Sequence, residues 1–173
     1  MTLDYTGKVV IVTGAGGGLG RCHALEFARR GAKVVVNDLG GSVDGSGGSS
    51  EAADKVVEEI KAAGGEAMSN GSSVTDDAGV ANMVSQTMDA YGRIDVLVNN
   101  AGVLRDKSFA KMEIADFDFV VDVHLFGTMK PTKAVWPIMK EQGYGRILVT
   151  SSSSGLYGNF GQSNYGAAKL GVV

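Results

Sequence analysis

Short runs of β-branched and other apolar residues alternate along this chain with longer segments in which apolar residues recur every three or four positions. The short runs are typical of buried strands, and the longer segments are typical of helices that cover a sheet. We predict strands at Lys8–Thr13, Lys33–Asn37, Glu66–Asn70, Asp95–Asn99 and Arg146–Ser151. This alternation predicts an α/β fold built on a doubly wound parallel sheet.

The segments between these strands carry the expected helices. Glu51–Ala63 has one apolar face, and Gly64 is suited to end that helix. Other helices are predicted at Leu19–Arg30, around Val80–Met88, from about Ile114 and from about Asn164. Proline lacks an N–H and disrupts a helix interior, so the helix from Ile114 is expected to bend or end by Pro131 and Pro137.

Domain organisation is predicted to be simple. No internal repeat or change of composition divides the chain, so residues 1–173 are expected to form a single domain. The glycine- and serine-rich segment Gly40–Ser50 has the composition of a flexible linker between a strand and a helix of that domain. The last predicted helix has only begun when the sequence stops at Val173, so we expect a domain truncated after its fifth strand.

Composition excludes several classes of protein. The chain has 173 residues, 44% of them hydrophobic and 20% charged, with a net charge of −3, which fits neither a disordered chain nor a basic nucleic-acid binder. No apolar run approaches the roughly 18 residues of a membrane span, and no export signal precedes the first strand. We therefore expect a soluble, cytoplasmic protein with neither nucleic-acid nor membrane partners.

A glycine-rich turn, Gly14–Gly20, follows the first strand and precedes a helix. Its glycines fit the spacing G-x-x-x-G-x-G, and Leu19 breaks the commoner G-x-G-x-x-G pattern. Glycines at such a turn let the backbone approach a pyrophosphate, and the amino end of the helix supplies free N–H groups. A flexible turn without a ligand is the alternative for this motif taken alone.

The second strand is followed by Asp38, about 20 residues after the glycine turn, where a carboxylate can accept hydrogen bonds from an adenosine ribose. Its charge repels a 2′-phosphate, and the adjacent Leu39-Gly40-Gly41 offers no cation, so NAD is favoured over NADP. The alternative is a solvated aspartate in a turn.

Polar residues gather where the predicted strands end, at Asn99–Gly102 and Thr150–Gly155. The carboxyl ends of parallel strands meet at one edge of a sheet, so these clusters should join the glycine turn, Asp38 and Ser73 at a ligand crevice. Turns are generally rich in glycine, serine and asparagine, which explains the residue types but not their order.

Tyr165 and Lys169 lie four positions apart and therefore share one face of the last predicted helix. A tyrosine beside a cation can act as a general acid or base, and Ser152 could orient a substrate oxygen toward it. Taken alone, this pair is far more typical of an ordinary surface helix. His23, His124 and Cys22 are too few and too scattered for a zinc site, so no metal is expected.

Together these residues resemble the short-chain dehydrogenase/reductase family over the whole chain. The resemblance implies a Rossmann-type fold in which Tyr165 is the general acid/base, Ser152 polarises the substrate oxygen, and Lys169 assists the tyrosine. The cofactor-binding residues that it implies are Gly14, Gly16, Gly18, Leu19, Gly20, Asp38, Ser73, Val74, Asn99, Asn100, Ala101, Gly102, Tyr165 and Lys169.

Two positions depart from the family pattern. Ser73 stands where the family often has aspartate, and His124 aligns with a catalytic asparagine; His124 is either part of a proton relay or a packed helix residue.

Three segments, Asn37–Gly41, Leu104–Phe109 and Leu156–Gln162, are similar to family members that oxidise (3R)-3-hydroxyacyl-CoA with NAD in fatty acid metabolism. That likeness also implies a homodimer or homotetramer, located in peroxisomes in a eukaryote. The alternatives are a 3-oxoacyl carrier-protein reductase or another short-chain carbonyl reductase, and a nucleotide-binding fragment without catalysis.

Overall fold

The computed structural model describes residues 3–173 and contains one five-stranded parallel sheet. Its strands are β1 (Val9–Thr13), β2 (Lys33–Asn37), β3 (Glu66–Asn70), β4 (Val96–Asn99) and β5 (Arg146–Val149), in the order β3-β2-β1-β4-β5. The predicted strands and the doubly wound α/β fold are confirmed.

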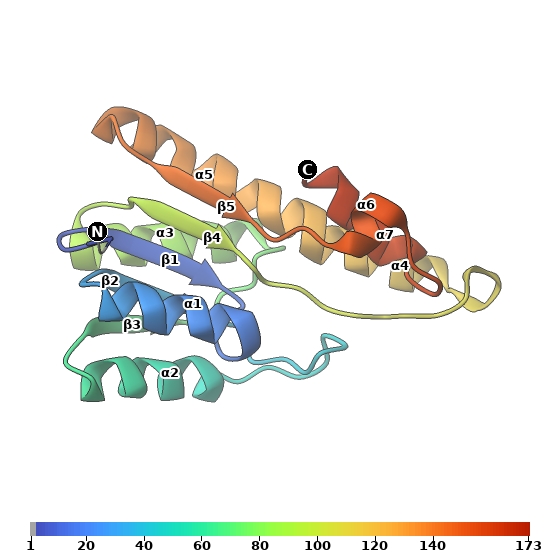
Figure 1. Ribbon diagram of the computed structural model, residues 1–173, viewed down its shortest axis with the longest axis horizontal. Helices are drawn as coiled ribbons and strands as arrows, with labels where there is room; N and C mark the ends of the chain where they lie inside the picture. The colour runs from blue at the N-terminus through green and yellow to red at the C-terminus, as the bar shows by residue number, and fades with distance from the viewer. Residues whose placement is uncertain (1–2) are drawn as a thin grey trace.

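Helices cover both faces of this sheet (Figure 1). They are α1 (Gly18–Arg29), α2 (Glu51–Ala62), α3 (Asp77–Tyr91), α4 (Ile114–Val121), α5 (Gly127–Gln142), α6 (Ser153–Tyr157) and α7 (Ser163–Gly171), with a 3-10 turn η1 (Phe109–Lys111) and a π-helical segment η2 (Asp122–Phe126). Among the described residues, no helix combines the length and apolar character that a bilayer span requires.

The strand residues alternate between two apolar clusters, one on each face of the sheet. Val10 and Val12 pack in a cluster with residues of α1 and α2, whereas Ile11 packs on the other face with Met83 of α3 and Val135 of α5. Strands that are buried on both faces need apolar residues at every position. This explains the uninterrupted valine and isoleucine runs of the sequence.

The helix from Ile114 is expected to bend or end by Pro131 and Pro137. It ends before both prolines, because α4 stops at Val121, but the helical path resumes through η2 into α5. Both prolines lie inside α5, which runs on to Gln142. Val135 and Met139 are buried against the sheet, and this packing supports α5 although each proline removes a backbone hydrogen bond. The irregularity lies upstream of both prolines, in η2.

The Gly40–Ser50 segment is a folded loop and not an unstructured linker. The N–H of Ser49 donates to the carbonyl of Leu39 at 3.1 Å, which draws the two ends of the loop together. Beyond this neck, Ser42 and Ser46 pair through a 2.8 Å backbone hydrogen bond. The glycines of this loop allow turns with positive φ, as at Gly40 and Gly47, and do not make the loop a flexible linker.

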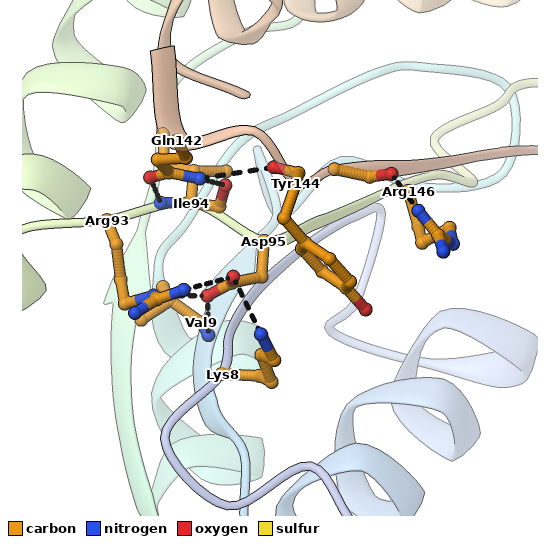
Figure 2. Close-up of polar contacts among 9 residues, drawn as sticks. Lys8, Val9, Arg93, Ile94, Asp95, Gln142, Tyr144 and Arg146 are labelled. Carbon is orange, nitrogen blue, oxygen red and sulfur yellow. Dashed lines mark hydrogen bonds and ion pairs between the residues drawn. The ribbon is translucent and has the colours of Figure 1, made fainter. Parts of the chain in front are cut away.

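A buried carboxylate fixes the amino-terminal edge of the sheet (Figure 2). Asp95, which is fully buried, accepts the N–H of Val9 at 2.9 Å and two hydrogen bonds of 2.7 Å from Arg93, and it pairs with Lys8 at 3.5 Å. Burial alone would raise the pKa of Asp95, but these hydrogen bonds and charges outweigh it and lower the pKa. The starts of β1 and β4 are thus joined at the edge opposite the polar clusters.

Candidate active site

The glycine turn has a packed side and an open side. At Gly14, where φ is +61°, a Cβ would lie 2.7 Å from the Cα of Ala101, and a Cβ on Gly20 would collide with the carbonyl of Gly14. A Cβ on Gly17 or Gly18 would meet nothing within 4 Å. The open side faces the start of α1, where the first backbone N–H groups have no capping side chain. This is the arrangement in which a helix terminus accepts a phosphate.

Asn100 joins the segment after β4 to the glycine turn. Its Nδ2 donates to the carbonyls of Thr13 at 3.0 Å and Gly14 at 2.9 Å. In return, Oγ1 of Thr13 accepts the N–H groups of Asn100 at 3.0 Å and Ala101 at 3.1 Å. Asn99 points the other way and donates to Thr132 of α5 at 3.1 Å. Thr13 was not among the predicted site residues, although it borders the motif.

Asp38 reaches the same turn from β2. Its Oδ2 accepts the N–H of Gly16 at 2.7 Å, and its Oδ1 accepts the N–H of Gly40 at 2.7 Å. A Cβ on Gly16 would lie 2.9 Å from Oδ2, so only glycine permits this approach. A carboxylate oxygen can accept more than one hydrogen bond, which leaves capacity for a ribose hydroxyl.

The segment after β3 joins the site less directly. Ser73 is hydrogen-bonded to Thr75 at 2.9 Å, and Val74 is buried against the start of α5, where a Cβ on Gly127 would lie 2.7 Å from it. None of the described contacts links either residue to the glycine turn. Both residues follow β3 and take no part in the described hydrogen bonds of the glycine turn.

Tyr165 and Lys169 occupy α7 as predicted. Lys169 is buried, and its ammonium lies 5.6 Å from the centre of the Tyr165 ring. The ammonium donates to the carbonyl of Thr150 at 2.5 Å, and burial lowers the pKa of Lys169 to about 8. Thr150, at the end of β5, therefore holds the lysine in place, a role that no sequence motif indicated.

Ser152 is the N-cap of α6, a short helix that the sequence pattern does not predict. Its Oγ caps the helix by accepting the N–H of Ser154 at 3.2 Å. The preceding Ser151 donates to the carbonyl of Lys169 at 3.0 Å. These contacts tie the serine-rich segment to the helix that carries the tyrosine.

His124 lies in η2 and faces Tyr165. The two rings meet edge to face, with their centres 5.0 Å apart. Nε2 of His124 is 2.7 Å from the carbonyl oxygen of Val103, whereas the buried Nδ1 has no hydrogen-bond partner among the described residues. Burial lowers the pKa of His124 to about 4, so the ring is neutral at physiological pH. A Cβ on Gly102 would collide with this ring, so the glycine makes room for it.

Asn164 is a site residue that sequence analysis missed. It is fully buried, and its side chain donates to the carbonyl of Arg105 at 3.1 Å and accepts the N–H of Tyr165 at 2.7 Å. It therefore fixes the start of α7 against the segment that follows β4. Its partner Arg105 is 59 positions away, too far for a local pattern to indicate the contact.

A comparison with protein families decides the membership of the chain. The family model described as short chain dehydrogenase matches residues 8–173. The chain belongs to the short-chain dehydrogenase family. The family resemblance predicted from the sequence is confirmed.

Known proteins agree with this assignment. The chain is 59% identical over its whole length to peroxisomal multifunctional enzyme A of Dictyostelium discoideum, of which it spans 38%. It is 58% identical over 99% of its length to peroxisomal multifunctional enzyme type 2 of Mus musculus, of which it spans 23%. A solved 7α-hydroxysteroid dehydrogenase, complexed with NADH and 7-oxo glycochenodeoxycholic acid, matches at 32% identity with a TM-score of 0.88, over 96% of this chain and 62% of that one.

Packing of the glycine turn gives a first prediction. Gly20→Ala should lower the free energy of unfolding by about 1–3 kcal/mol, because its Cβ overlaps the carbonyl of Gly14. Gly17→Ala is the matched control, since neither glycine has positive φ and Gly17 has open space around it. Denaturant unfolding of both variants measures the difference. Equal stabilities would contradict the packed geometry of the turn.

Burial of His124 gives a second prediction. Its folded pKa of about 4 lies below the ordinary value of 6.5, so the unfolded chain binds the proton first and acid favours unfolding. Between about pH 7 and about pH 4, this residue should remove about 3 kcal/mol of stability. Asparagine does not titrate in this range. Over the same pH interval, the free energy of unfolding of the His124→Asn variant should therefore fall by about 3 kcal/mol less than that of the wild-type protein. Parallel stability curves for the two proteins would show that the imidazole is not desolvated.

Proposed function

We propose that this chain is the NAD-binding, catalytic part of a dehydrogenase that oxidises (3R)-3-hydroxyacyl-CoA to 3-oxoacyl-CoA. The observation that carries the proposal is one sheet edge that bears an open glycine turn, a carboxylate beside it, and the Tyr165–Lys169 pair. The hydroxyacyl thioester is supported by the likeness of the segments around Asp38, Arg105 and Tyr157 to family members with that activity, and by the two multifunctional enzymes named above.

The residues present fit NAD. The open faces of Gly17 and Gly18 and the uncapped start of α1 suit the pyrophosphate. Asp38 would bind the adenosine ribose hydroxyls, and its charge disfavours a 2′-phosphate. Ser73 and Val74 would border the adenine. Ala101 and Gly102, with the flanking asparagines, would line the crevice next to the turn.

The proposed chemistry assigns one task to each side chain. Bound NAD supplies the hydride acceptor. Oγ of Ser152 donates a hydrogen bond to the substrate oxygen and holds it near Tyr165, whose phenolic oxygen takes the hydroxyl proton as the alcohol becomes a ketone. The buried ammonium of Lys169 favours the ionised form of the phenol. Neutral His124 supports the tyrosine ring from its edge, which makes it a positioning group in this scheme.

Assembly and location follow as parts of the same proposal. Met129 and Trp136 are 47% and 60% exposed on α5, and apolar side chains of this size favour burial against another subunit. We therefore keep a homodimer or homotetramer as the expected state. In a eukaryotic cell the proposed location is the peroxisome, to which the names of both relatives refer.

Removal of the phenolic hydroxyl of Tyr165 tests the proposed mechanism. Tyr165→Phe should lower kcat for (3R)-3-hydroxyacyl-CoA by about 10²–10⁴-fold, because the proton acceptor is lost, while NAD still binds. Tyr157→Phe removes the same atom from a residue that is 86% exposed and should leave kcat unchanged. NADH formation measures turnover, and titration with NAD measures binding. Full activity of the Tyr165 variant would exclude the proposed base, and a preference for (3S) substrates would exclude the assigned stereochemistry.

Asp38 should determine cofactor choice. The wild-type protein should have a higher kcat/KM with NAD than with NADP. Asp38→Asn should lower the ratio of these two kcat/KM values by about tenfold, because it removes a repulsion between the carboxylate and the 2′-phosphate worth about 1.4 kcal/mol. Asp89→Asn, an exposed change on α3, controls for the loss of charge. Faster turnover with NADPH in the wild type would instead favour a 3-oxoacyl carrier-protein reductase.

A further inference from the structure

Part of the Gly40–Ser50 loop contacts the far side of the crevice. We call residues Ser42–Ser46 the strap. The carbonyl of Val43 accepts the N–H of Leu104 at 2.9 Å, and the carbonyl of Asp44 accepts Nε of Arg105 at 3.1 Å. The strap belongs to the connection after β2, whereas both donors follow β4. Two segments that leave the sheet at different strands are therefore joined outside it.

The path of the strap crosses the glycine turn. In the sheet β1 lies between β2 and β4, so a connection from the end of β2 to the segment after β4 must pass the end of β1. Figure 1 shows the loop after β2 extending beyond the carboxyl ends of the strands, toward the chain that leaves β4. Asn100 thus contacts the glycine turn directly, and the strap passes outside the end of β1 to reach Leu104.

The strap is a small closed turn on a narrow neck. Within it, Gly45 N–H donates to the carbonyl of Ser42 at 2.8 Å, and Asp44 accepts the N–H of Ser46 at 3.0 Å. The neck is the Leu39–Ser49 hydrogen bond already described. Because the turn is held by its own hydrogen bonds, it can leave Leu104 and Arg105 as a unit without unfolding.

Arg105 connects the strap to the tyrosine. Its guanidinium pairs with Asp116 at 2.9 Å and lies over the Phe119 ring at 4.4 Å, which fixes the side chain while Nε reaches Asp44. Its backbone carbonyl accepts the side chain of Asn164, which in turn holds the N–H of Tyr165. One residue thus contacts both the strap and the start of the catalytic helix.

We propose that the strap closes over the bound dinucleotide and that Arg105 is the positioning residue that latches it. This inference rests on the proposed function, since it assigns the strap to the same NAD site. The latch uses backbone carbonyls of the strap as acceptors, so it releases and re-forms without any change in charge. Loss of the latch should speed dissociation of the cofactor and raise its KM, and should leave the KM for the hydroxyacyl thioester unchanged.

Two glycines of the loop give a matched test. Gly45 and Gly47 have φ of +84° and +78°, so alanine strains the backbone equally at both. Only at Gly45 would the new Cβ meet the far side, at 2.6 Å from the Phe119 ring and 3.2 Å from Val103; at Gly47 it meets nothing within 4 Å. In the full-length protein, Gly45→Ala should raise the NADH dissociation rate about tenfold over Gly47→Ala, as measured by stopped-flow fluorescence.

Arg105 and Lys107 give a second matched pair, because both bind Asp116 at 2.9 Å but only Arg105 touches the strap. Arg105→Met should raise the dissociation rate and the KM for NAD, and Lys107→Met should change neither. Equal rates within either pair would overturn the strap as a closure. A wild-type protein that binds no NAD would instead refute the proposed function, so the two failures are distinguishable. Thermal unfolding of all four variants checks that each is folded.

Discussion

The paired amide and hydroxyl of Asn100 and Thr13 form the cross-link on which the site depends. The Asn100 side chain donates to two carbonyls at the end of β1, and Thr13 accepts two N–H groups from the segment after β4. Breaking such a pair in a buried setting leaves polar groups unsatisfied, at about 1–3 kcal/mol each. Asp95 joins the opposite ends of the same two strands. Because β1 and β4 are held at both ends, the glycine turn and the residues after β4 cannot slide apart.

A second constraint comes from the charge that the site buries. Lys169 is 4% exposed, and burial lowers its pKa from 10.5 to about 8, which corresponds to about 3 kcal/mol of lost stability when the amine is charged. Below about pH 8 the amine is protonated in both the folded and the unfolded chain, so the full cost in stability applies. This cost decreases as the pH rises toward 10.5. His124 avoids the same cost by staying neutral. A fold that keeps an ammonium buried near Tyr165 therefore has lower stability, a cost typical of positions that serve the function proposed here.

The sequence was informative wherever a physical requirement is local. Strands such as Val34–Val36 are buried on both faces, so uninterrupted apolar runs in the sequence predict them. The spacing of Tyr165 and Lys169 places them on one face of a helix without any tertiary information. What could not be predicted depends on contacts between distant segments. Helix α5 continues through Pro131 and Pro137 because burial of Val135 supports it, and no local sequence pattern indicates the π-helical segment η2. Likewise the order of Gly40–Ser50 comes from its own turns and from partners more than sixty positions away, such as Arg105.

The segment Asn100–Arg105 explains how the separate parts of the site hold their relative positions. Asn100 bonds the glycine turn, Val103 bonds His124 beside the tyrosine, and Arg105 bonds both the strap and Asn164. This short stretch after β4 therefore contacts the glycine turn, the strap, His124 and the start of α7. A displacement of its backbone must therefore move these structures together. The residues proposed to act on cofactor and substrate lie on several helices, but their relative positions depend on one segment of six residues.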